Sequence, residues 1–359
     1  MTSSNVLAQV LFEEKSANNG YKIAMATLNV PKSLNALNLS MIKLLHKQLT
    51  AWLTDPEIAV IMLMGSGEKA FCAGGDVRSI VEQGVQKNAI AKEFFATEYK
   101  MNARIHHFSK PFIALLDGIV MGGGVGVSIH GSHRIVTEKT LFAMPESAIG
   151  LIPDVGGSYF LPRLPGALGR YLGLTGARLK GSDILHAGIG TAYMSSDKIN
   201  DFVEALKNED IISHDDVDQL IAKIAEDPGH APIDEFRDLI DAAFSELTVE
   251  DIFEHLSEID HDWARETYAV LKKMSPISLK VITEQLNRGG KLEFDDCMIM
   301  EYRIVCAISA YDSDFYEGVR AVLIDKDHNP NWMPATLGDV SHDMVLAHFN
   351  VPSHGDLSL

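Results

Sequence analysis

The first half of this chain alternates short apolar runs with segments of helical periodicity, and this rhythm restricts the fold more than any other feature. The runs are rich in Val, Ile, Leu and Met, which favour strands, whereas the segments between them repeat apolar residues at helical spacing. Gly, Pro and Asn separate the two kinds of segment. The pattern predicts an α/β fold. The expected strands are 6–12, 21–28, 60–65, 112–117 and 133–136, and the expected helices are 40–51, with Ser40 as its cap, and 91–108.

Beyond about residue 190 the sequence becomes mainly helical. Charged segments with helical spacing follow one another from residue 195 to residue 310, without an internal repeat. We therefore expect an α/β catalytic core over residues 1–200 and a helical C-terminal region over residues 201–359. A chain of 359 residues, of which 46% are hydrophobic, has the length and the apolar material for two such parts.

Acidic residues outnumber basic ones by 49 to 31, which gives a formal net charge of −18 with neutral histidines. Such a surface repels nucleic-acid phosphates and anionic lipids, so we expect neither a nucleic acid nor a membrane as a partner. The three cysteines, Cys72, Cys297 and Cys306, are too scattered for a disulfide framework or a metal site. No secretory signal or transit peptide is visible in the first 20 residues, and we expect a cytoplasmic location.

Two turns of small residues follow strand-like runs. One is Lys69-Ala-Phe-Cys-Ala-Gly-Gly-Asp-Val-Arg78 and the other contains the triplet Gly122-Gly-Gly124. Glycine lets a ligand approach the backbone, whose free N–H groups can bind a phosphate or a polarised carbonyl oxygen. Each turn alone could equally serve packing. Two of them in one core favour an oxyanion hole, in which converging N–H groups stabilise a negatively charged oxygen.

Glu146 and Asp154 stand in an otherwise apolar stretch punctuated by Gly and Pro, from residue 144 to residue 159. A carboxyl group in apolar surroundings has a raised pKa and can exchange protons near neutral pH. The alternative for Asp154 is that it caps a helix that begins near Gly157. For Glu146 the alternative is a paired or surface-exposed structural role.

The order of these segments resembles that of the enoyl-CoA hydratase/isomerase, or crotonase, superfamily. The resemblance rests on Pro31-Lys-Ser-Leu-Asn-Ala-Leu37, Phe71-Cys-Ala-Gly-Gly-Asp76, Gly122-Gly-Gly124 and Pro145-Glu146. It implies a core of ββα units wound into a spiral, an acyl-CoA substrate and assembly as a homo-oligomer. It further implies that the N–H groups of Ala73 and Gly123 bind the thioester oxygen, and that Lys32 meets the CoA phosphates.

One departure from the superfamily pattern selects a branch. Hydratases of the superfamily carry a second catalytic glutamate three residues after the middle glycine of the triplet, where this chain has Gly126. The chain has instead Asp154, eight residues after Glu146, and in this it resembles the 3-hydroxyisobutyryl-CoA hydrolases. Further similarities to that branch are Glu98-Tyr99, the run Glu317-Gly-Val-Arg-Ala-Val-Leu-Ile-Asp-Lys-Asp327 and Trp332.

The resemblance implies hydrolysis of 3-hydroxyisobutyryl-CoA in valine degradation, with 3-hydroxypropionyl-CoA as a second candidate substrate and no metal or cofactor. Glu146 would activate water or attack the thioester carbon, Asp154 would assist beside it, and Glu98 would bind the 3-hydroxyl group. Two other functions stay open: an enoyl-CoA hydratase or isomerase that uses Glu146 alone, and a non-catalytic acyl-CoA-binding protein. Gly126 disfavours the hydratase, and the retained carboxyl groups disfavour the pure binder.

Overall fold

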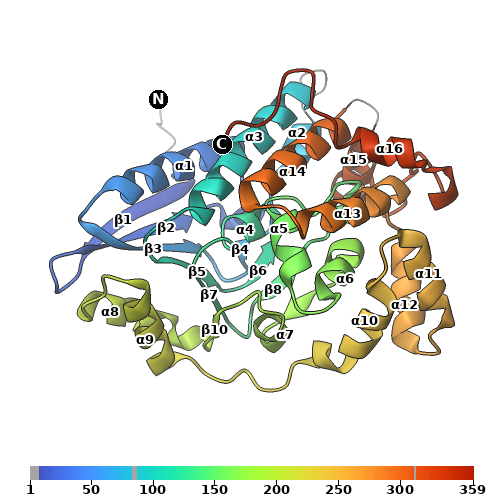
Figure 1. Cartoon of the computed structure of the whole chain (residues 1–359). Coiled ribbons are helices and arrows are strands. Elements are labelled where there is room, and N and C mark those ends of the chain that lie inside the picture. The colour runs from blue at the N-terminus through green and yellow to red at the C-terminus, as the bar shows by residue number, and fades with distance from the viewer. Residues whose placement is uncertain (1–7, 83–86, 311–312) are drawn as a thin grey trace.

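The computed structural model describes residues 8–82, 87–310 and 313–359, and within these ranges the strands form two sheets (Figure 1). The larger sheet has the order β1-β2-β3-β5-β7-β10 and the smaller one β4-β6-β8-β9. The pairs β1–β2 and β8–β9 are antiparallel, and the other pairs are parallel. The strands are β1 Val10–Ser16, β2 Lys22–Leu28, β3 Ile58–Gly65, β4 Ala70–Cys72, β5 Phe112–Leu116, β6 Ile119–Met121, β7 His133–Val136, β8 Leu141–Ala143, β9 Leu179–Lys180 and β10 Ala192–Tyr193.

The chain passes repeatedly from the larger sheet to the smaller one. β3, β5 and β7 of the larger sheet lead directly into β4, β6 and β8 of the smaller sheet, and a helical segment follows each pair. This is the repeated ββα unit of the predicted fold, which is thereby confirmed. The helical segments of this half are η1 Pro31–Ser33, α1 Leu39–Thr54, α2 Val77–Val81, α3 Lys87–His106, α4 Gly123–Gly126, η3 Glu146–Ile149, α5 Gly157–Phe160, α6 Leu168–Thr175 and α7 Ser182–His186.

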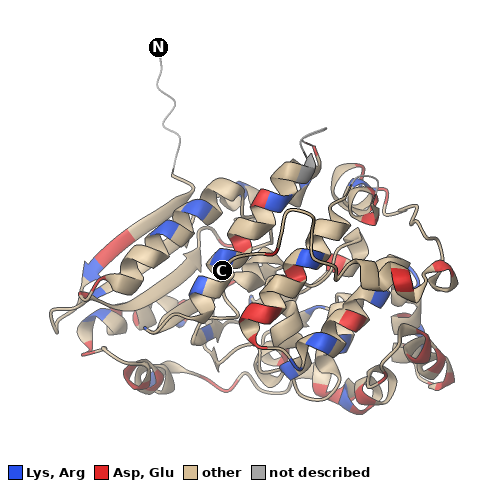
Figure 2. Ribbon diagram, turned by 45° about the horizontal axis from the view of Figure 1, so that its top comes forward, with Lys and Arg blue, Asp and Glu red and all other residues tan. Residues whose placement is uncertain are grey.

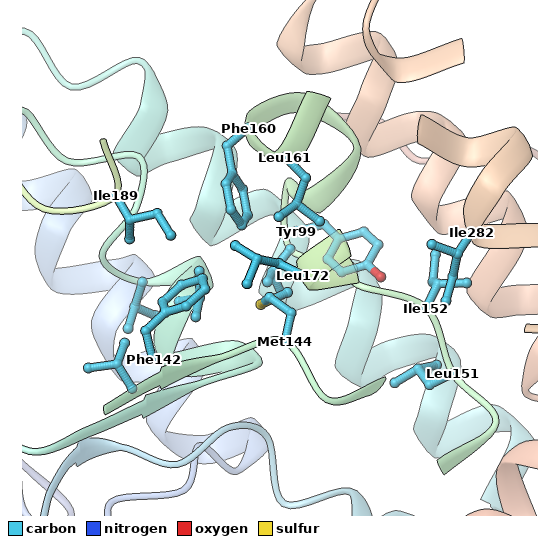
Figure 3. Packing of buried hydrophobic residues seen from close by; sticks show 14 of the residues in the cluster. Tyr99, Phe142, Met144, Leu151, Ile152, Phe160, Leu161, Leu172, Ile189 and Ile282 are labelled. Carbon is cyan, nitrogen blue, oxygen red and sulfur yellow. The ribbon is translucent and has the colours of Figure 1, made fainter. Parts of the chain in front are cut away.

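Helices dominate the chain after β10, as the sequence predicts (Figure 1). They are α8 Ile199–Asn208, α9 His214–Ile224, α10 Arg237–Phe244, α11 Val249–Glu258, α12 Asp262–Leu271, α13 Pro276–Gly289, α14 Phe294–Ile308, α15 Asp314–Val319, the π-helical turn η7 Arg320–Ile324 and α16 His342–Ala347. A boundary at residue 200 stays a prediction, because one hydrophobic core contains side chains from both parts. Figure 3 shows Phe142 of β8 and Leu172 of α6 in one cluster with Ile282 of α13.

Several predicted boundaries are wrong; the helix predicted over residues 91–108, for example, runs from Lys87 to His106. The first strand begins at Val10 rather than at residue 6, and residues 6 and 7 lie outside the described ranges. It extends to Ser16, because its polar residues pair with β2 at the edge of the sheet. The first long helix is capped by Asn38 and not by Ser40, since the Asn38 side chain accepts a hydrogen bond from the Met41 N–H at 3.0 Å.

The C-terminal region packs directly on the turn that carries Glu146. A Cβ atom at Gly318 of α15 would lie 2.4 Å from the Ile149 carbonyl carbon, and one at Gly150 would lie 2.4 Å from the Asp314 carbonyl carbon. The two backbones therefore touch without side chains between them.

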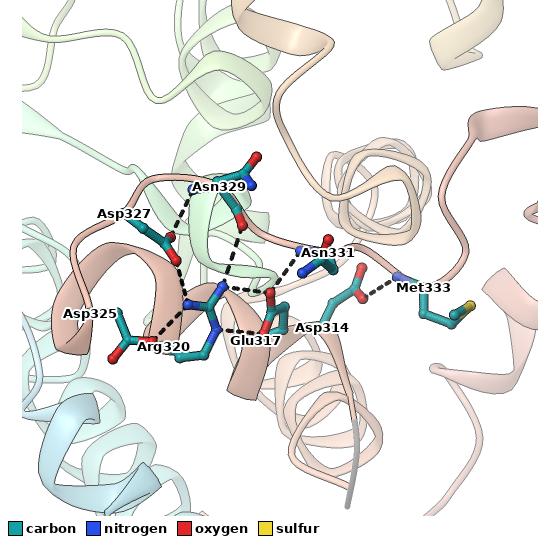
Figure 4. A network of polar contacts seen from close by, with 8 residues as sticks. All are labelled: Asp314, Glu317, Arg320, Asp325, Asp327, Asn329, Asn331 and Met333. Carbon is teal, nitrogen blue, oxygen red and sulfur yellow. Dashed lines mark hydrogen bonds and ion pairs between the residues drawn. The ribbon is translucent and has the colours of Figure 1, made fainter.

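Arg320 fixes the chain that follows α15 (Figure 4). Its guanidinium group donates to Glu317 at 2.8 and 2.9 Å, and also to Asp325 and Asp327. Glu317 in turn accepts the Asn331 N–H at 2.7 Å. A planar group with several donors suits such a network, because it holds several carboxylates at once.

The contact between α15 and η3 predicts that Gly318→Ala destabilises the protein by about 1–3 kcal/mol, because the added methyl group has no space beside Ile149. Urea unfolding measures this loss. Gly338→Ala is the matched control, since its nearest neighbour to an added Cβ is Thr336 at 3.8 Å. Equal stability of the two variants would contradict the backbone contact.

Candidate active site

Three buried carboxyl groups from three segments surround the glycine triplet. Glu98 comes from α3, Glu146 begins η3, and Asp154 lies in the loop before α5; their exposed fractions are 2%, 5% and 4%. A Cβ atom at Gly123 would lie 2.6 Å from Glu98 Oε1, and one at Gly122 would lie 3.0 Å from Glu146 Oε1. The two glutamates therefore reach neighbouring residues of one turn, and any side chain on that turn would displace them.

The polar contacts of these groups leave acceptors for a ligand. The Tyr99 hydroxyl donates to Asp154 Oδ2 at 2.7 Å, and the Tyr99 ring is packed in the apolar cluster of Figure 3. Asp154 therefore does not act as a side-chain cap; the residue that caps α5 is Gly156. Within the described residues, Glu98 Oε1 and Glu146 Oε2 have no hydrogen-bond partner. A buried polar atom without a partner is costly unless a ligand or water binds it.

Burial and mutual repulsion keep these carboxyl groups protonated to unusually high pH. Burial is the larger cause for Glu98 and Glu146, whose pKa values lie well above 4.5, and the negative charge of Asp154 raises both pKa values further. Burial also raises the pKa of Asp154 to about 6, although the hydrogen bond from Tyr99 opposes the rise. The cluster can therefore take up or release protons near neutral pH.

Two backbone N–H groups next to these carboxyl groups are those of Gly75 and Gly123. Neither donates to an acceptor within the described part of the chain, and Gly75 N lies 3.1 Å from the position of a Cβ atom at Gly123. The expectation for Ala73 is wrong, because its N–H donates to the Leu34 carbonyl oxygen at 3.0 Å. Sequence reasoning singled out this turn but could not tell which N–H within it stays free.

Gly126 is surrounded by side chains. A Cβ atom there would lie 2.6 Å from Val155 Cβ and 2.9 Å from Asn102 Nδ2. Asn102 and Val155 therefore fill the space into which a glutamate at position 126 would project. Nothing in the sequence marks Asn102 other than its place one helical turn after Glu98.

A separate cavity adjoins the turn at residues 69–78. It has a volume of about 380 Å³, and Lys32, Asn35 and Lys69 are among its lining residues. Leu34 also lines it and accepts the Ala73 N–H, so the cavity borders the same turn that carries Gly75. Lys32 lines this cavity, and its contact with the CoA phosphates stays a prediction; Lys69 is a second cation there that the sequence analysis did not single out. Figure 2 shows that acidic and basic residues are otherwise interspersed over the ribbon.

A fourth buried carboxyl group was also missed. Glu301 of α14 has an exposed fraction of 0%, and burial raises its pKa to about 8. Hydrogen bonds from Ser158 and Gly156 lower this pKa, whereas repulsion from Asp154 raises it. In the sequence Glu301 stands in a helical segment with no motif around it, more than 140 residues from Asp154.

Among the described residues, no three His, Cys, Asp or Glu side chains are arranged to hold a metal ion. No helix within the described ranges is both long enough and apolar enough to span a bilayer. The need for no cofactor stays a prediction.

Comparison with known proteins gives concordant results. A sequence model described as enoyl-CoA hydratase/isomerase matches residues 23–349. Proteins named 3-hydroxyisobutyryl-CoA hydrolase, mitochondrial, are 45% identical in Danio rerio, over 100% of this chain and 94% of the relative, and 46% identical in Homo sapiens, over 97% and 90%.

Solved structures resemble the whole chain as well. A carnitinyl-CoA dehydratase from Mycobacterium thermoresistibile has a TM-score of 0.88 at 39% identity and covers 97% of this chain and 98% of its own. An enoyl-CoA hydratase from Rhodobacter sphaeroides has a TM-score of 0.88 at 33% identity, over 98% and 100%.

The expected cytoplasmic location is wrong, because the relatives carry the word mitochondrial in their names. The expectation rested on the absence of a recognisable targeting segment near the N-terminus. An absence of this kind is weak ground for a compartment, and the residues of the site hold no information about it.

The raised pKa values predict that the free energy of unfolding falls as pH rises from about 5 to 8. Asp154 and Glu301 keep their protons in the folded state up to pH values of about 6 and about 8, whereas their ordinary pKa values are 3.8 and 4.5. The contribution of each group to the free energy of unfolding is therefore fully present below its ordinary pKa. It is lost as pH rises through the raised pKa, at roughly 1 kcal/mol per pH unit for each group.

Urea unfolding at several pH values measures this dependence. Glu301→Gln should flatten the part between pH 6 and 8, because the variant has no proton to lose there. The surface variant Asp296→Asn is the control on the same helix. An unchanged slope in Glu301→Gln would contradict the raised pKa.

Proposed function

The chain belongs to the enoyl-CoA hydratase/isomerase family, and we propose that within this family it hydrolyses the thioester of 3-hydroxyisobutyryl-CoA. Similarity to hydrolases of that name over the whole chain supports the assignment. The observation that carries it in the site is that Glu146 and Asp154 are buried close enough for their charges to interact, near two N–H groups that have no acceptor among the described residues, together with the filled space at Gly126. Valine degradation is the pathway in which this reaction is expected.

The thioester carbonyl oxygen would accept hydrogen bonds from the N–H groups of Gly75 and Gly123. These donors are fixed by the fold before the substrate binds, so they can stabilise the oxyanion of the tetrahedral intermediate without reorganisation. The CoA phosphates would lie toward Lys32 and Lys69 at the adjoining cavity.

Glu146 would supply the nucleophile. Its free oxygen, Oε2, either removes a proton from an attacking water or bonds to the thioester carbon and forms an anhydride that water then hydrolyses. In both routes the C–S bond breaks, water supplies the new oxygen of the acid, and the thiolate of CoA takes a proton. Because the buried acids titrate as one coupled group, Asp154 would hold a proton while Glu146 is ionised and would then deliver that proton to the thiolate.

Glu98 would bind the 3-hydroxyl group of the acyl chain. Its Oε1 atom has no partner among the described residues and lies beside Gly123, where the thioester is expected. Because the raised pKa of Glu98 favours the protonated form, this carboxyl group can both donate to and accept from a hydroxyl. A pocket of this kind distinguishes substrates by the hydroxyl more than by one methyl group, so 3-hydroxypropionyl-CoA is a second proposed substrate.

The packing at Gly126 disfavours hydration. A hydratase with two catalytic glutamates needs space at this position, and Asn102 and Val155 occupy that space. A pure acyl-CoA binder would not need buried acidic groups beside the thioester, since they are costly to bury. The assembly of the chain into a homo-oligomer remains a proposal from the family resemblance.

Thiol release from 3-hydroxyisobutyryl-CoA tests the proposed reaction. Glu146→Gln and Asp154→Asn should each lower kcat by about 10²-fold or more, because the first removes the nucleophile and the second the group beside it. Both variants should still bind CoA. Water addition to crotonyl-CoA, measured in parallel, should be negligible for the wild type; rapid hydration without thiol release would overturn the hydrolase assignment.

Gly123→Ala tests the oxyanion donors. The added methyl group would lie 2.6 Å from Glu98 Oε1 and 3.1 Å from Gly75 N, so the turn must shift. Loss of one aligned donor should lower kcat by about 10²- to 10³-fold. Gly338→Ala, which adds the same methyl group far from the site, should leave kcat unchanged, and full activity of Gly123→Ala would rule out this oxyanion hole.

A further inference from the structure

The loop that carries Asp154 has an unfavourable backbone conformation, which contacts from outside the loop must stabilise. Val155 has φ of +52° and Gly156 has φ of +92°. A β-branched residue rarely adopts a left-handed conformation, because its Cβ atom meets the neighbouring carbonyl oxygen. Such strain persists only where the surroundings fix the backbone, and it is typical of functional segments.

Glu301 of α14 fixes this backbone from the C-terminal region. Its Oε2 atom accepts the Gly156 N–H at 2.8 Å, and its Oε1 atom accepts the Ser158 N–H at 2.9 Å. The Ser158 hydroxyl lies within hydrogen-bond distance of the same Oε1 atom. One fully buried carboxyl group thus binds two backbone donors, the first of which is two residues from Asp154.

Other contacts hold the neighbouring carbonyl groups. His130 Nε2 donates to the Val155 carbonyl oxygen at 2.7 Å, and Gln285 Nε2 donates to the Pro153 carbonyl oxygen at 2.8 Å. The Asp154 side chain is held by Tyr99. Glu301 is the group that holds the N–H side of the strained segment.

We propose that Glu301 is a positioning residue for Asp154: its two oxygens bind the N–H groups of Gly156 and Ser158 and thereby hold the Asp154 carboxyl group beside Glu146. The proposal rests on the proposed function of Asp154 and adds a residue from the helical C-terminal region to the machinery of the site. Glu301 acts through the backbone and does not touch the substrate.

Both oxygens of Glu301 are needed for this role. A glutamine has the same shape, but its amide nitrogen cannot accept a hydrogen bond, whereas each oxygen of a carboxyl group keeps acceptor capacity even when one of them carries a proton. One of these bonds must therefore break in Glu301→Gln, and the loop loses one of its fixed points. A displacement of about 1 Å in a catalytic group can lower a rate by about 10²-fold.

Thiol release from 3-hydroxyisobutyryl-CoA by the full-length protein tests the proposal. Glu301→Gln should lower kcat by about 10- to 100-fold and leave KM within about twofold, because the CoA-binding cavity is formed by other segments. Ser158→Ala, which keeps both backbone bonds, should lower kcat less. Asp296→Asn removes an exposed carboxyl group from the same helix and should have no effect.

A double-mutant cycle separates positioning from general destabilisation. If Glu301 acts through Asp154, then Glu301→Gln should cost nothing further in the Asp154→Asn background, whereas independent effects would multiply. If Glu301→Gln fails to fold, as judged by circular dichroism, the same cycle is measured with Ser158→Ala, which should likewise have no further effect on kcat in the Asp154→Asn background. Wild-type kcat in Glu301→Gln, or effects that multiply, would overturn the positioning role. Full activity of Asp154→Asn would instead overturn the proposed role of Asp154 itself.

Discussion

The site depends on the enclosure of several acidic groups in one apolar interior. Glu98, Glu146, Asp154 and Glu301 are all nearly inaccessible to water, and repulsion from Asp154 acts on the other three. Keeping all four carboxyl groups ionised in this interior would cost too much free energy, so fewer than four of them carry a negative charge at the same time. Hydrogen bonds offset part of the cost of burial: the Tyr99 hydroxyl donates to Asp154, and backbone N–H groups of the Asp154 loop donate to Glu301. The same enclosure gives the acids the proton affinity that thioester chemistry requires.

Glycine provides the space in which these groups meet. At Gly122 and Gly123 the absence of a side chain leaves room for a glutamate oxygen. At Gly126 it leaves room for Val155 and Asn102, and at Gly318 for the backbone of the turn that carries Glu146. The acids, the free N–H donors and the C-terminal helices therefore approach one another as closely as bare backbone allows. Close packing of this kind lets a small shift of one segment reach the others, because interiors are dense and little compressible.

Much of this arrangement could be predicted from the sequence. The alternation of strands and helices gave the fold class, and the order of the short motifs pointed to Glu98, Glu146, Asp154 and Gly123. The errors have physical causes. Which N–H of the 69–78 turn stays free depends on Leu34, a contact that periodicity does not reveal. Glu301 and Asn102 have ordinary helical surroundings in the sequence, and only the packing of α14 and α3 against the Asp154 loop sets them apart.

The contacts of Glu301 and Gly318 also bear on the order in which the site is completed during synthesis. Asp154 leaves the ribosome long before Glu301, and the two N–H groups that Glu301 binds are more than 140 residues away from it in the chain. Contacts of such long range form late, because the intervening chain must first be made and then closed into a loop. The α/β half can thus bury its own strands early, whereas the positions of its buried carboxyl groups are fixed only once the C-terminal helices have packed against it. The backbone that carries Asp154 therefore gains its last fixed points only after α14 has been synthesised.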